Sequence, residues 1–162
     1  MTQRNQAILP ARYTVPWRDA FYERTAPALN PGAIILDVGS GRKPALDPSH
    51  RPPECRYIGL DISRRELELA PPGAYDEVWV SDITERVLEL EDKFDLVVSW
   101  QVLEHVRSLP LALENLHAYL RPGGRLVALL SGRYSAFGLV NSIVPSQIGV
   151  WGMERLLGRN PE

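Results

Sequence analysis

Cysteine, net charge and long apolar runs are all scarce in this 162-residue chain. The single cysteine, Cys55, excludes an internal disulfide framework and is typical of a reducing compartment. A formal net charge of −2 provides no global field that would draw the protein onto nucleic acid or anionic lipid. No stretch reaches the length of about 18 apolar residues that spans a bilayer, and the first residues contain no apolar segment of signal-peptide length. We therefore expect a cytoplasmic protein with no nucleic-acid partner and no membrane span.

Five short apolar runs are present, at the spacing of strands that alternate with helices. They lie at 33–38, 56–60, 77–80, 94–99 and 125–130. Several are apolar almost throughout, as in Ile34-Ile35-Leu36, which is typical of strands whose two faces are both covered. The pattern predicts an α/β fold, with a mostly parallel sheet and helices on both faces.

Helical signals lie before and between these runs. Residues 17–29 predict an amphipathic helix with Trp17 and Phe21 facing inward. Ser63 and Glu66 form a capping box, which opens a second helix that prolines end after residue 70.

A third helix is predicted after Ser108, because Pro110 stands near its first position and Pro122-Gly123-Gly124 can end it. Its predicted buried stripe consists of Leu109, Leu113, Leu116 and Leu120. By contrast, residues 42–56, here called the proline-rich connection, contain four prolines. Proline lacks an amide donor, so we expect at most one helical turn there.

The chain divides into three predicted parts. Residues 1–30 form an N-terminal helical segment, 31–131 a Rossmann-like core, and 132–162 an amphipathic C-terminal segment. The last segment could serve as a lid over a substrate, as a homodimer contact or as an interfacial segment that touches lipid. Its few basic residues favour the first two interpretations.

A Gly-x-Gly turn follows the first apolar run directly. Gly39 and Gly41 allow a sharp turn and the close approach of a ligand. A dinucleotide-binding fingerprint requires a third glycine where this chain has Pro44, and a pyrophosphate would lack its helix N-terminus. This argues against an NAD-dependent oxidoreductase.

Three aspartates fall at the carboxyl ends of the first three runs, the edge at which open α/β sheets bind ligands. They are Asp37, Asp61 and Asp82. Asp61 can accept both ribose hydroxyl hydrogens of an adenosine, while Asp82 meets the adenine amino group and Ile83 packs on the ring. Three acids without a phosphate cradle favour a cationic nucleoside, such as S-adenosylmethionine.

Five motifs follow one another along the chain, namely ILDVGSGRKP, YIGLDIS, VSDITE, FDLVVSWQVLEHV and LRPGGRLVALL. As a set, they resemble class I S-adenosylmethionine-dependent methyltransferases of the small-molecule type. The resemblance implies a sheet in the order 3-2-1-4-5-7-6, of which five strands are visible, so the chain is expected to be a C-terminally truncated form.

The resemblance also implies roles for individual residues. Asp37, Gly39, Ser40 and Gly41 would line the methionine end of the cofactor, Asp61 and Ile62 the ribose side, Asp82 and Ile83 the adenine, and Trp100 and Gln101 the face near the sulfonium. Tyr13, Trp17, Trp100 and Tyr134 would shape the pocket of the acceptor.

The expected function is direct transfer of the sulfonium methyl group to an unidentified small-molecule acceptor. His105 is the candidate general base, although it can also be read as a structural residue of the turn after the fourth strand. No metal is expected, because Gln101 replaces the first acid of a Glu-x-x-Glu-His pattern. A non-catalytic cofactor-binding module derived from a methyltransferase is the alternative.

Overall fold

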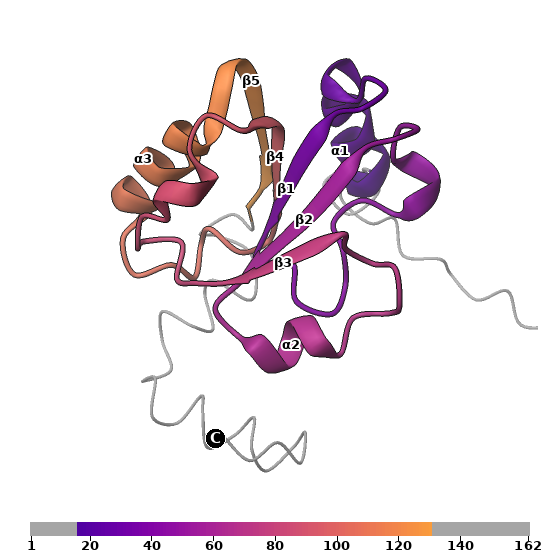
Figure 1. The fold of residues 1–162 in the computed structure, drawn as a ribbon. Coiled ribbons are helices and arrows are strands. Elements are labelled where there is room, and N and C mark those ends of the chain that lie inside the picture. The colour runs from indigo at the N-terminus through magenta and orange to yellow at the C-terminus, as the bar shows by residue number, and fades with distance from the viewer. Residues whose placement is uncertain (1–15, 131–162) are drawn as a thin grey trace, which may run out of the picture. The chain divides into compact units, whose positions relative to one another are not determined.

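The structure is a computed structural model that describes residues 16–130. Within this part, five parallel strands form one sheet in the order β3-β2-β1-β4-β5 (Figure 1). The strands are β1 (Ile34–Val38), β2 (Arg56–Asp61), β3 (Glu77–Val80), β4 (Phe94–Trp100) and β5 (Leu120–Leu129). All five predicted strands are confirmed, and their order matches the first five positions of the expected sheet. β5 begins earlier than predicted.

Three α-helices accompany the sheet in the described residues. They are α1 (Trp17–Thr25), α2 (Arg64–Glu68) and α3 (Leu109–Tyr119), and short 3-10 turns occur at η2 (Ala26–Ala28), η3 (Pro48–His50) and η4 (Leu88–Leu90). In Figure 1, α1 and α3 lie on opposite faces of the sheet. The doubly wound, Rossmann-like α/β class is therefore confirmed. None of the helices within 16–130 has the length and apolar character needed to cross a bilayer.

Alternate residues of the strands supply two separate cores. On the face covered by α3, Leu36 and Val38 of β1 pack in a cluster with Leu116 and Tyr119. On the face covered by α1, Ile35 packs in a second cluster that includes Phe21 and Leu46. Because successive strand residues point to opposite faces, both faces of β1 are buried, as its nearly continuous apolar sequence indicates.

The first helix differs from its prediction in length and orientation. The α-helix ends at Thr25 rather than near residue 29, and a 3-10 turn that contains Pro27 follows it. Proline has no amide hydrogen for the α-helical ladder, which explains the early end. Phe21 is buried as predicted, but Trp17 is 51% exposed, so its inward assignment was wrong.

The predicted buried stripe of α3 is confirmed at Leu116, which is fully buried, but is wrong at Leu109 and Leu113. Leu109 and Leu113 are 40% and 41% exposed, whereas the buried residues are Ala112, Asn115, Leu116 and Tyr119. Two polar anchors fix this orientation: the Asn115 amide donates to the Ile83 carbonyl at 2.8 Å, and the Tyr119 hydroxyl accepts from the Val87 amide at 2.9 Å. The helix ends at Tyr119, before the predicted Pro-Gly-Gly stop.

The proline-rich connection contains no α-helix, as predicted, and only the η3 turn is regular. Side-chain hydrogen bonds hold it instead. One carboxylate oxygen of Asp37 accepts from the Ala45 amide at 2.7 Å and from the Tyr57 hydroxyl at 2.6 Å. The same hydroxyl accepts from the Leu46 amide at 3.0 Å, and the Arg51 guanidinium lies 3.6 Å from the centroid of the Tyr57 ring. These contacts order a segment that cannot form the usual crossover helix.

Candidate functional site

A cavity of about 340 Å³ lies at the carboxyl ends of β1 to β4. Seven of the residues singled out from the sequence line it, namely Gly39, Asp61, Ile62, Asp82, Ile83, Gln101 and His105. Its remaining lining residues are Val38, Leu60, Ser81, Val102, Val106 and Arg107. Segments that lie more than 60 positions apart in the sequence therefore meet at the sheet edge where open α/β folds bind ligands.

The Gly-x-Gly turn needs both of its glycines. Gly39 and Gly41 have φ angles of +70° and +47°, a region that side-chain-bearing residues rarely adopt. A Cβ on Gly39 would lie 2.3 Å from Cγ2 of Val102, and the Gly39 amide donates to the Leu60 carbonyl at 2.8 Å. Gly39 is thus tightly enclosed by Val102, and it forms part of the cavity wall.

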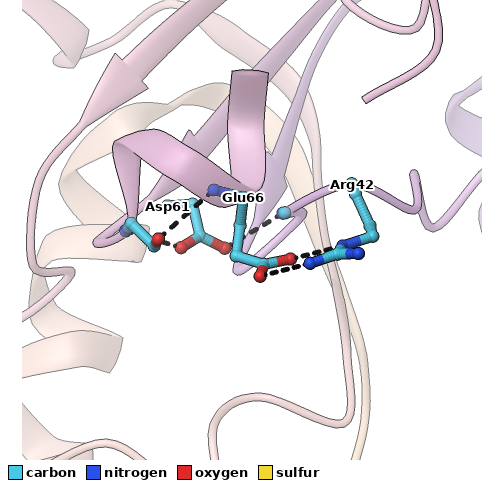
Figure 2. Close-up of polar contacts among 5 residues, drawn as sticks. Arg42, Asp61 and Glu66 are labelled. Carbon is cyan, nitrogen blue, oxygen red and sulfur yellow. Dashed lines mark hydrogen bonds and ion pairs between the residues drawn. The ribbon is translucent and has the colours of Figure 1, made fainter. Parts of the chain in front are cut away.

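Asp61 joins the turn to the beginning of α2 (Figure 2). Its carboxylate accepts from the Gly41 amide at 3.0 Å through one oxygen and from the Ser63 amide at 2.8 Å through the other. The Ser63 hydroxyl accepts from the Glu66 amide at 3.2 Å, which confirms the Ser63 side of the predicted capping box, and the Glu66 carboxylate accepts from Arg42. A carboxylate has about four acceptor positions, so Asp61 retains capacity for ribose hydroxyls.

Asp82 is held in a local turn by the residue two positions on. One carboxylate oxygen accepts from the Thr84 amide at 2.9 Å and from the Thr84 hydroxyl at 2.8 Å. These hydrogen bonds lower the pKa of Asp82, and the Arg107 charge lowers it further. Asp82 is therefore ionised at neutral pH and can accept a hydrogen bond from an amino group.

Asp37 has a different position from the other two aspartates. Its side chain is buried, is absent from the cavity lining and binds the proline-rich connection. Burial raises the pKa of Asp37 from 3.8 to about 7, against the lowering effect of its hydrogen bonds. Ser40 is buried as well. Asp37 thus acts on the site through the backbone that follows Gly41.

The raised pKa of Asp37 predicts a pH-dependent stability. In the folded state the carboxyl retains its proton up to about pH 7, whereas in the unfolded state it loses the proton near 3.8. Folding is therefore favoured by this group at low pH, and the contribution is lost as the pH rises from about 4 to 7. Relative to Asp37→Asn, wild type should lose up to about 4 kcal/mol of unfolding free energy across this window.

Urea unfolding of both proteins between pH 4.5 and 8 measures this difference. Asp82→Asn is a suitable control, because a lowered pKa places its effect at more acidic pH. A difference between wild type and Asp37→Asn that stays constant over the window would contradict the assignment.

Of Trp100 and Gln101, which were predicted to lie near the sulfonium, only Gln101 lines the cavity. The Trp100 ring packs edge-on against Phe21 at a centroid distance of 5.0 Å, and the Arg18 guanidinium lies 4.6 Å from its centroid. Trp100 therefore belongs to the α1 side of the sheet. Gln101 lines the cavity with a φ of +56°, a strained conformation for a residue with a side chain.

The turn after β4 supplies His105 and the residues that the sequence reading missed. The His105 amide donates to the Val102 carbonyl at 2.8 Å. Both residues line the cavity, as does Arg107. No apolar periodicity marks this turn, and only the charge of Arg107 could have drawn attention to it. Across 16–130, no group of three or more His, Cys, Asp or Glu residues is arranged to hold a metal ion. Tyr13, Tyr134 and the segment 132–162 lie outside the described residues.

Comparison with known proteins identifies the family of the chain. The model of a methyltransferase domain family matches residues 11–156. The ubiquinone biosynthesis O-methyltransferase of Brucella melitensis is 30% identical over 119 residues, which cover 70% of this chain and 48% of that protein. The demethylmenaquinone methyltransferase of Symbiobacterium thermophilum is 31% identical over 75% of this chain and 51% of its own length. The chain thus spans about half the length of these relatives.

Solved structures of methyltransferases share the fold of this chain. An S-adenosylmethionine-dependent methyltransferase from Mesorhizobium loti is 25% identical, with a TM-score of 0.54 over 66% of this chain and 49% of that one. The trans-methyltransferase CalH, solved with S-adenosylhomocysteine, is 26% identical, with a TM-score of 0.56 over 72% and 37% of the two chains. Taken with the match of the family model to most of the chain, these findings show that it belongs to the methyltransferase-domain family of Rossmann-like proteins.

Proposed function

We propose that the chain binds S-adenosylmethionine in the cavity at the carboxyl ends of β1 to β4 and transfers its methyl group to a small molecule. The observation that carries the proposal is the convergence of Gly39, Asp61 and Asp82 from three adjacent strands on one cavity. A glycine turn, two carboxylates and an apolar wall from Ile83 match the backbone, hydroxyl, amino and ring surfaces of an adenosyl group.

The polar groups of the cavity suit this cofactor better than a dinucleotide. Asp61 would accept from the ribose hydroxyls and Asp82 from the adenine amino group. No α-helix follows the Gly-x-Gly turn, because the proline-rich connection begins there, so a pyrophosphate would lack the amide groups of a helix N-terminus. The bound cofactor would supply an electrophilic methyl group on a positively charged sulfur.

The contribution of the protein to transfer would be to position the two reactants and to exclude water. The Brucella relative is named as an O-methyltransferase of ubiquinone biosynthesis and the Symbiobacterium relative as a demethylmenaquinone methyltransferase. Aromatic hydroxyls and quinol ring carbons are therefore the first acceptors to test. The fold alone does not establish transfer, since the [4+2]-cyclase SpnF, at 24% identity and a TM-score of 0.57, shares it. Binding and transfer therefore need separate measurements.

His105 is the proposed general base for a hydroxyl acceptor, because it lines the cavity on the β4 side. Removing a general base typically lowers the rate about 10²–10⁴-fold, so His105→Gln should lower kcat by at least about 100-fold. Affinity for S-adenosylhomocysteine should fall far less than kcat, since the proposed ribose and adenine contacts are those of Asp61 and Asp82.

Transfer of a tritiated methyl group from S-adenosylmethionine to a panel of catechols and hydroquinones measures the reaction. Asp95→Asn, at the amino end of β4, is the control for a substitution outside the cavity. Transfer by wild type supports the proposal, and a kcat that His105→Gln leaves unaltered would remove His105 from the chemistry. Cofactor binding without transfer to any acceptor would instead favour a non-catalytic binding module.

A further inference from the structure

The Gly-x-Gly turn is joined to α2 by a closed ring of five residues. Gly41 donates its amide to Asp61, and Asp61 accepts from Ser63. Ser63 in turn caps the Glu66 amide at 3.2 Å, and the Glu66 side chain returns to Arg42, the neighbour of Gly41 (Figure 2). Asp61 is the one member of this ring that lines the cavity.

The link between Arg42 and Glu66 is a two-pronged ion pair. The Arg42 Nε donates to Glu66 Oε2 and a terminal nitrogen donates to Oε1, both at 2.7 Å. A planar guanidinium that meets a carboxylate in this way fixes orientation as well as distance. Both side chains are somewhat more than one-third exposed, so solvent weakens the attraction without removing its geometry.

The position of the pair matters because the turn has no helix behind it. In the described structure the proline-rich connection follows the turn, so no helical ladder restrains Gly41 from that side. The Gly41 carbonyl instead accepts from the Tyr75 hydroxyl at 3.1 Å, and its Cα faces the Glu66 side chain, since an added Cβ would lie 3.5 Å from Glu66 Cβ. Side chains from elsewhere in the fold therefore hold the turn at Gly41.

We propose that Arg42 and Glu66 are positioning residues for the cofactor, which lock the Gly-x-Gly turn against Asp61 in the geometry that binds the ribose. The inference rests on the proposed function, because it concerns the same cavity. The pair does not touch the cavity, since neither residue lines it. Its effect on binding passes through the backbone of Gly41 and the carboxylate of Asp61.

Isothermal titration with S-adenosylhomocysteine tests the inference on the full chain. Arg42→Met and Glu66→Gln should each weaken binding about fivefold, and the double variant should weaken it no further, because one contact is lost in all three. Arg42→Lys, which keeps the charge but not the fork, should recover part of the affinity. Added salt should narrow the difference between wild type and Arg42→Met.

Arg56→Met is the matched control. Arg56 also forms an exposed ion pair, with Glu77 at 2.9 Å, but this pair joins the amino ends of β2 and β3. The Arg56→Met variant should keep the wild-type affinity for S-adenosylhomocysteine. Its melting temperature should shift as little as that of Arg42→Met. Hydrogen exchange without ligand supplies a second measurement, in which the Gly41 amide should exchange faster in Arg42→Met than in Arg56→Met.

The outcomes separate two failures. If wild type binds and Arg42→Met binds equally well, the positioning role is overturned while the proposed function stands. If wild type binds no S-adenosylhomocysteine, the proposed function fails and the positioning role fails with it. Equal losses of affinity for S-adenosylhomocysteine in Arg42→Met and Arg56→Met would also overturn the positioning role, because the loss would then follow from lower stability and not from the place of the ion pair.

Discussion

Gly39→Ala should destabilise the chain by about 2–5 kcal/mol. A left-handed backbone costs a residue with a side chain about 1–2 kcal/mol, and forcing a methyl group into a filled space costs about 1–3 kcal/mol more. Both terms apply here, since φ is +70° and the new Cβ would lie 2.3 Å and 2.4 Å from the two γ carbons of Val102. Thermal and urea unfolding measure the loss.

Two further variants separate the two terms. Gly32 has a φ of +76° and no atom within 4 Å of an added Cβ, so Gly32→Ala should incur the backbone cost alone. Combining Gly39→Ala with Val102→Ala removes the γ carbons and should recover part of the stability, although Val102 Cβ would still lie 2.8 Å away. Equal stabilities for Gly39→Ala and Gly32→Ala would contradict the packing argument.

Asp61→Ala should weaken binding of S-adenosylhomocysteine by at least about 100-fold. Hydrogen bonds to a charged group contribute about 1.5–3 kcal/mol each, and the carboxylate would accept from two ribose hydroxyls. The substitution also removes the acceptor of the Gly41 and Ser63 amides, so the turn and the start of α2 would lose their common anchor. Isothermal titration calorimetry measures the change in affinity.

Asp95→Asn is the control for the loss of affinity in Asp61→Ala. The Asp95 carboxylate also accepts a backbone amide, that of Ile34 at 2.8 Å, but it lies at the amino end of β4. The Asp95→Asn variant should bind S-adenosylhomocysteine as wild type does. The affinity of Asp61→Asn should lie between those of wild type and Asp61→Ala, because its side-chain amide keeps one acceptor oxygen. Retention of wild-type affinity by a folded Asp61→Ala protein would exclude a ribose contact at this carboxylate.

The strands and the edge that carries the site could be predicted from the sequence because they depend on local patterns. Continuous apolar runs indicate strands covered on both faces, and the residue after each run falls at the carboxyl edge of a parallel sheet. Together with the strand order that the family resemblance implies, this brings Gly39, Asp61 and Asp82 into one cavity. The helix cap at Ser63 depends on four successive residues, 63–66, and was predicted for the same reason.

Contacts between distant segments could not be predicted. Asp37 lies near the same sheet edge as Asp61, although β1 pairs it with Gly59 rather than with Asp61. Tyr57, 20 positions away, binds its carboxylate inside the protein. No periodicity distinguishes a strand-end acid that faces a ligand from one that holds a loop. The orientation of α3 shows the same limit, because a leucine repeat defines an apolar stripe, whereas the Asn115 hydrogen bond to Ile83 decides which side is buried.

A crystal structure of the chain with S-adenosylhomocysteine tests the central claim most directly. We predict the ribose hydroxyls within hydrogen-bond distance of Asp61, the adenine beside Asp82 and Ile83, and the Gly-x-Gly turn against the amino-acid part of the ligand. A ligand bound elsewhere on a folded chain, or a ribose turned away from Asp61, would contradict the account.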